Sequence, residues 1–112
     1  MNARRNLVLA GLALLVAGAA LARDVLIDVR TGQEFQSGHI QTAINLPHTS
    51  IGEEIAGARV SKDDHIIVYC KSGRRAALAF ETLKGLGYAN VENYGGLEEA
   101  GKRLQLPIHT DH

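Results

Sequence analysis

The chain has one cysteine, no tryptophan and two prolines among its 112 residues. A single cysteine excludes an internal disulfide, so the fold has to be held together by its hydrophobic core. It also leaves the thiol of Cys70 without a second thiol in its own chain. No charge of one sign dominates, because 12 Lys and Arg balance 12 Asp and Glu. Nothing in the composition therefore points to nucleic acid or to an anionic membrane surface as a partner.

Residues 1–22 have the features of an export signal. Arg4 and Arg5 form a basic start, residues 7–19 are apolar apart from two glycines, and residues 20–22 (Ala-Leu-Ala) fit a cleavage site. An uncleaved membrane anchor is the alternative. The apolar stretch is short for a spanning helix, which needs about 20 residues, so we favour cleavage.

Cleavage after Ala22 would leave a single small domain of residues 23–112 in the periplasm. Loss of Arg4 and Arg5 leaves 10 Lys and Arg against 12 Asp and Glu, a net charge of −2. We expect this domain to be a monomer with no stable membrane association.

The most informative stretch runs from Ile66 to Ala76 (Ile-Ile-Val-Tyr-Cys-Lys-Ser-Gly-Arg-Arg-Ala). Its four β-prone residues predict a strand buried on both faces, and the apolar spacing over residues 76–86 predicts a helix. Cys70 therefore ends a strand shortly before a helix begins. Open α/β sheets bind ligands at that edge, and the backbone N–H groups of a helix start stabilise a thiolate.

The loop after Cys70 combines a glycine with three cations, Lys71, Arg74 and Arg75. Such a loop can curl into a nest of backbone N–H groups that holds an anion, and Gly73 gives the backbone the freedom to do so. The loop contains no general base, so the chemistry would depend on a thiolate alone. A buried, inert cysteine is the alternative, and the cationic loop disfavours it.

Strand and helix patterns alternate along the rest of the chain. Strands are predicted at 24–29, 43–46, 66–69 and 90–94, and helices at 33–37, 51–58, 76–86 and 97–104. Residues 38–40 are expected to be a connection, and residues 107–112 a frayed tail. The alternation predicts a small α/β domain with a mostly parallel central sheet and helices on both faces.

Other polar residues have mainly structural interpretations. Asp28 and Arg30 follow an apolar strand, and we expect them to have a structural role, pairing with polar groups beside the active-site edge. His48 and His65 have no carboxylate or cysteine at a fitting spacing, which indicates surface residues. His109, Asp111 and His112 lie on a tail that is too flexible for a closed metal site, so we expect no metal.

A set of motifs in this chain resembles the rhodanese family. The early motifs are Asp28-Val29-Arg30, Glu34-Phe35, Gly38-His39-Ile40 and Ala43-Ile44-Asn45-Leu46-Pro47; the central one is Tyr69 to Ala76; the closing ones are Gly87-Tyr88, Val91 and Gly95-Gly96-Leu97. They cover nearly all of residues 23–112 in the family's order. One departure is Leu97-Glu98-Glu99, where the family often has a tryptophan.

The resemblance implies a thiosulfate sulfurtransferase without a cofactor. Cys70 would take the sulfane sulfur of thiosulfate as a persulfide, release sulfite, and pass the sulfur to cyanide or a thiol. The substrate-binding cradle would comprise Lys71, Ser72, Gly73, Arg74 and Arg75. The resemblance also implies that His39 is a hydrogen-bonding buttress. We expect Arg75 to matter most among the cations, because it ends the loop where the helix begins.

Two other functions compete with this one. A sulfur carrier or anion-binding module would hold the persulfide for a partner and turn over little by itself. A phosphatase is disfavoured, because the related phosphatases and arsenate reductases have five residues between the cysteine and an arginine. Here Ala76 occupies that position, and Arg75 comes one residue early.

The export hypothesis has a direct test. Amino-terminal sequencing of the protein from the periplasmic fraction of a Gram-negative host should begin at Arg23, because cleavage is expected after Ala22. An intact Met1 in the membrane pellet would instead show an anchor.

Overall fold

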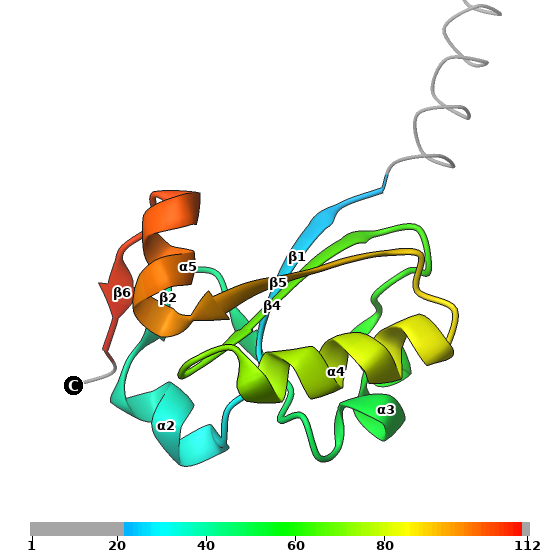
Figure 1. Cartoon of the computed structure of the whole chain (residues 1–112), viewed down its shortest axis with the longest axis horizontal. Coiled ribbons are helices and arrows are strands. Elements are labelled where there is room, and N and C mark those ends of the chain that lie inside the picture. Colours follow the sequence, from blue (N-terminus) through cyan, green and yellow to red (C-terminus); the bar gives the residue numbers. More distant parts are fainter. Residues whose placement is uncertain (1–21, 111–112) are drawn as a thin grey trace, which may run out of the picture.

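Four parallel strands form the central sheet, and its inner strands are the apolar runs that the sequence predicts. The order across the sheet is β3 (Ile44–Asn45), β1 (Asp24–Asp28), β4 (His65–Cys70) and β5 (Asn90–Gly96) (Figure 1). Residues 66–70 are buried, because β4 has a strand on either side and helices above and below. The predicted α/β class with a mostly parallel sheet is confirmed.

The computed structural model describes residues 22–110. Apart from Ala22, the predicted export signal lies outside this part of the chain, and so do Asp111 and His112. Within residues 22–110, no helix is long and apolar enough to cross a membrane. The division into a signal and a domain stays a prediction.

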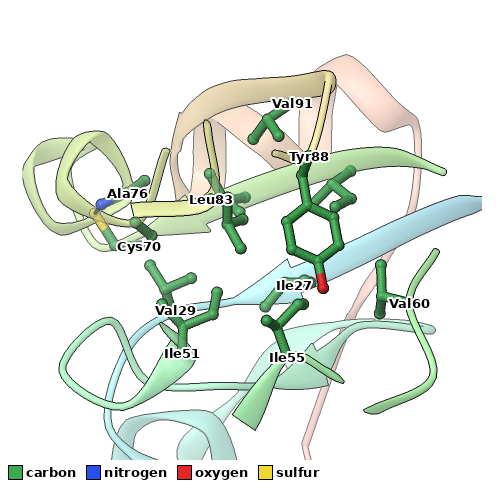
Figure 2. Close-up of a cluster of buried hydrophobic side chains, with 13 residues drawn as sticks. Ile27, Val29, Ile51, Ile55, Val60, Cys70, Ala76, Leu83, Tyr88 and Val91 are labelled. Atoms are coloured by element: carbon green, nitrogen blue, oxygen red, sulfur yellow. Dashed lines mark hydrogen bonds between the residues drawn. The ribbon is translucent and has the colours of Figure 1, made fainter. Parts of the chain in front are cut away.

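Side chains of β4 alternate between two core clusters, one on each face of the sheet. Ile66, Val68 and Cys70 belong to the cluster shared with α3 (Ile51–Glu54) and α4 (Arg74–Gly85), part of which Figure 2 shows. Ile67 and Tyr69 belong to the cluster on the other face, with α5 (Leu97–Leu104). The alternation is the two-residue period of a strand. It places the Cys70 side chain on the face covered by α4.

The shorter helices lie where the sequence predicts them. α2 (Gly32–Ser37) begins at a capping box, in which Thr31 and Glu34 satisfy each other's backbone N–H groups. The predicted helix at residues 51–58 is divided into α3 and a 3-10 helix, η1 (Ala56–Ala58).

Two segments predicted as a connection and a frayed tail pair with each other instead. β2 (His39–Ile40) and β6 (Ile108–His109) form an antiparallel two-stranded sheet. The tail is held just before β6, where the Gln41 N–H donates to the carbonyl of Pro107 at 2.9 Å. The predictions for 38–40 and 108–109 are therefore wrong. Two paired residues are too few to leave a periodic pattern in the sequence.

His65, predicted to have no carboxylate partner, lies between two of them. Its Nδ1 is 3.0 Å from Asp24 Oδ1, and its Nε2 is 2.6 Å from Glu92 Oε2. The parallel register places Asp24 beside His65 across β1 and β4. The hydrogen bond that the His65 ring donates to the Glu92 carboxylate is the main cause that raises the pKa of His65 above its ordinary 6.5.

This cluster predicts that stability decreases as the pH rises. The pKa of His65 is higher in the folded state than in the unfolded state, so its stabilising effect is full below pH 6.5 and is lost as the pH rises through the folded value. Because all three side chains are partly exposed, the loss should be below about 1 kcal/mol. Urea unfolding from about pH 5.5 to about pH 9 measures it.

His65→Gln is the control, since glutamine cannot titrate. The slope of the free energy of unfolding with pH should become flatter in this variant. An unchanged slope would assign the pH dependence to other groups.

Candidate active site

Cys70 is the last residue of β4 and lies at the carboxyl edge of the sheet. Cys70 is 1% exposed. Figure 2 shows its side chain beside Ala76 at one end of the core cluster, away from Tyr88 and Val60. The sequence disfavoured a buried, inert cysteine; the structure shows that Cys70 is buried, and its reactivity stays a prediction. The loop turns back over the sulfur and covers it.

The buried sulfur is nevertheless in a polar setting. The N–H of Gly73 donates to Cys70 Sγ at 2.9 Å, and the N–H of Ala76 does so at 3.4 Å. Both donors favour a negative charge on the sulfur. They also supply two of the inward N–H groups that an anion-binding nest requires.

The sulfur also completes the start of α4. Gly73 is the N-cap residue, in the left-handed region at φ +97°, and it has no side chain to cap the helix. Ala76 is the third residue of the helix. The side chain of an N-cap residue normally accepts a hydrogen bond from the N–H at this position. Cys70 Sγ accepts that hydrogen bond instead. The helix start and the cysteine are therefore coupled by one contact.

The end of β5 forms a wall against the loop. A Cβ on Gly96 would lie 2.3 Å from the carbonyl oxygen of Lys71, so only glycine allows this approach. Asn93 links the two segments: its Nδ2 donates to Gly73 O at 3.0 Å, and its Oδ1 accepts from the Gly95 N–H at 2.8 Å. Sequence reasoning missed Asn93. Its place two residues before the double glycine Gly95-Gly96 was the available signal.

The predicted cradle residues separate into two groups. Lys71 and Ser72 are exposed on the loop, and Arg74 is exposed at the first position of α4. Within residues 22–110, Lys71 and Arg74 have no side-chain hydrogen bond or ion pair. Arg75 is half-buried and turns toward α2, where it makes a two-pronged pair with Glu34 at 2.7 and 3.0 Å. Lys71 and Arg74 thus remain available to an anion.

Glu34 is a second residue that sequence reasoning missed. The hydrogen bonds from Arg75 are the main cause that lowers the pKa of Glu34 to about 2, so its carboxylate stays charged. The pair offsets much of the positive charge of Arg75 and ties the first turn of α4 to α2. The capping box with Thr31 accounts for Glu34 in α2 without Arg75, and no short-range spacing in the sequence points to this second contact.

Asp28 and Arg30 form a buried pair under the site, which confirms the structural interpretation. Arg30 Nη2 lies 2.6 Å from Asp28 Oδ2 and also donates to Gly38 O at 2.6 Å. His39 is a buttress as well, because its Nδ1 lies 2.8 Å from Phe35 O and its ring stacks on Phe35. These contacts fix the segment that faces the cysteine loop.

An open cleft of about 410 Å³ lies beside the loop. Its lining residues are Arg30, Glu34, Ser37, Lys71, Leu97 and Glu98. Figure 1 shows α2, α5 and the β4–α4 loop at the same end of the sheet. Among the described residues, no three His, Cys, Asp or Glu side chains come together as a metal site.

Comparison with known proteins gives a consistent set of relatives. Residues 13–102 match the Rhodanese-like domain family. The thiosulfate sulfurtransferase PspE of Escherichia coli K12 is 42% identical over 91 residues, covering 81% of this chain and 88% of that protein. A sulfurtransferase of Allochromatium vinosum is 37% identical, covering 75% of this chain and 77% of that protein.

A solved structure described as a rhodanese with anions from E. coli superimposes with a TM-score of 0.71 and 39% identity. The match covers 79% of this chain and 99% of that one.

Proposed function

Because the chain belongs to the rhodanese-like domain family, as its motifs predicted, we propose that it is a thiosulfate sulfurtransferase that carries the sulfur on Cys70. The observation that supports this most is the pair of backbone N–H groups directed at Cys70 Sγ. A relative with 42% identity is named a thiosulfate sulfurtransferase, and the solved relative is described with anions. An export signal at residues 1–22 would place the activity in the periplasm.

The first step transfers sulfur from the donor. The Cys70 thiolate attacks the sulfane sulfur of thiosulfate, a new S–S bond forms at Sγ, and the donor's S–S bond breaks. Sulfite leaves with the electron pair, and the negative charge of the thiolate passes to the terminal sulfur of the persulfide. No base is required, since no proton moves.

The second step returns the cysteine to its starting state. Cyanide or a thiolate attacks the terminal sulfur, and the electron pair of the persulfide bond returns to Sγ. The products are thiocyanate or a new persulfide on the acceptor. The transferred sulfur lies about 2 Å beyond Sγ, so the acceptor has to reach that atom and not the buried Sγ itself.

The loop residues have separate roles in this proposal. The N–H groups of Gly73 and Ala76 stabilise the negative sulfur, while Lys71 and Arg74 attract the thiosulfate dianion. Ser72 lies exposed on the loop between them. Arg75, held by Glu34, fixes the first turn of α4 and thereby the donor N–H of Ala76.

The burial of Cys70 favours a second candidate, a sulfur carrier that turns over little without a partner. With 1% of the residue exposed, discharge to small acceptors would be slow. Steady-state thiocyanate formation from thiosulfate and cyanide separates the candidates, because a carrier would load once and stop.

The persulfide has a mass signature. Incubation with thiosulfate should add one sulfur atom, about 32 Da, at Cys70, because only a thiolate can accept it. Intact-mass measurement detects the adduct, and Cys70→Ser should abolish both the adduct and thiocyanate formation. Activity that survives this substitution would rule out the mechanism.

Alanine substitutions at the two arginines should separate steering from positioning. Arg74→Ala should lower kcat/KM for thiosulfate by roughly three- to tenfold at low salt, and the loss should shrink in high salt because exposed charges are screened. Arg75→Ala also removes the pair with Glu34, so it should cost roughly tenfold to a hundredfold and the loss should persist in salt.

Lys102→Ala, which removes an exposed cation in the last turn of α5, is the control, and circular dichroism checks the fold of every variant. If both arginine variants matched the parent at every salt concentration, the backbone donors alone would account for the site.

A further inference from the structure

The cleft beside the loop contains one unpaired charge of each sign. Two of its charged residues are neutralised, since Arg30 pairs with Asp28 and Glu34 pairs with Arg75. The other two, Lys71 and Glu98, are exposed, and in the described part of the chain neither has an ion pair or a side-chain hydrogen bond. The cleft therefore presents a free ammonium and a free carboxylate.

Both charges lie on segments that adjoin Cys70 in the fold. Lys71 directly follows Cys70. Glu98 comes two residues after Gly96, the residue that pairs with Cys70 between β4 and β5. The tight contact of Gly96 with the Lys71 carbonyl fixes the two segments against each other. At about 410 Å³, the cleft has the size of a small-molecule site.

We propose that this cleft binds the sulfur acceptor and selects a small thiol that carries both a carboxylate and an ammonium group; this inference rests on the proposed function. Lys71 would bind the carboxylate, and Glu98 would bind the ammonium. Thiosulfate is a dianion with no positive group, so Glu98 offers it no favourable contact. Glu98 is thus a specificity-determining residue for the acceptor and not for the donor.

The transfer to such an acceptor balances without a further reactant. The thiolate of the acceptor attacks the terminal sulfur of the Cys70 persulfide, and a new S–S bond forms. The bond to Sγ breaks, and its electron pair stays on Cys70 as a thiolate. The acceptor leaves as a persulfide with the same total charge.

Helix stabilisation is the competing explanation for Glu98. Acidic residues in the first turn of a helix interact favourably with its dipole, and α5 has both Glu98 and Glu99 there. Glu99 is also exposed but does not line the cleft. Glu99→Gln is therefore a matched control, because it removes the same charge from the same turn.

The experiment compares two acceptors that differ by one ammonium group, cysteine and 3-mercaptopropionate. Each protein is first loaded with thiosulfate and its persulfide is measured by mass. Then kcat/KM for discharge to each thiol is determined, and the ratio of cysteine to 3-mercaptopropionate is taken. Comparing this ratio between proteins cancels the different reactivities of the two thiols.

Glu98→Gln should lower the ratio by roughly three- to tenfold, as expected for one charge-assisted contact in an open cleft. Glu99→Gln should leave the ratio at the parent value, and both variants should still load with sulfur. If loading succeeds and Glu98→Gln keeps the parent ratio, acceptor selection by Glu98 is overturned while the sulfurtransferase proposal stands. If the parent does not load, the proposed function itself is overturned, and acceptor selection with it.

Discussion

The contact between Cys70 Sγ and the start of α4 is the interaction on which the rest of the site depends. A helix start leaves N–H groups without partners, and Gly73 has no side chain to satisfy them. The sulfur accepts hydrogen bonds from the N–H groups of Gly73 and Ala76 and so satisfies these two donors. The donors that complete the helix are also those that favour a negative sulfur. A buried cysteine at this place therefore completes the helix start and receives two backbone donors at its sulfur.

The surrounding contacts keep those donors in place from three separate segments. Glu34 holds Arg75 in the first turn of α4, and Asn93 holds Gly73 from β5. On the other side of β4, the Ile40 N–H donates to the hydroxyl of Tyr69 at 3.0 Å, which anchors the strand that carries the cysteine. Because parallel strands bring their carboxyl ends to one edge, segments far apart in sequence meet at this loop.

Much of the fold could be predicted from the sequence because it comes from local patterns. The apolar run before Cys70 and the helical spacing after it are sufficient to predict β4 and α4. The alternation of strands and helices is sufficient to predict a parallel sheet. What could not be predicted depends on register and tertiary contact. Examples are the carboxylates on either side of His65, the turn of Arg75 toward Glu34, and the coverage of Cys70 by its own loop. No short-range spacing encodes which distant residue lies across a strand.

The close approach of Gly96 to Lys71 has a consequence for a chain that is still being made. Synthesis proceeds from the amino terminus, so the cysteine loop emerges before the strand that forms its wall. Until β5 is in place, the loop lacks the contacts of Asn93 and Gly96, and the thiol has no fixed surroundings. The fixed surroundings of the thiol are therefore acquired late, when nearly the whole domain is available to fold. A growing chain would carry this sulfur without its backbone donors and wall in place, and only the finished chain could hold all of them together.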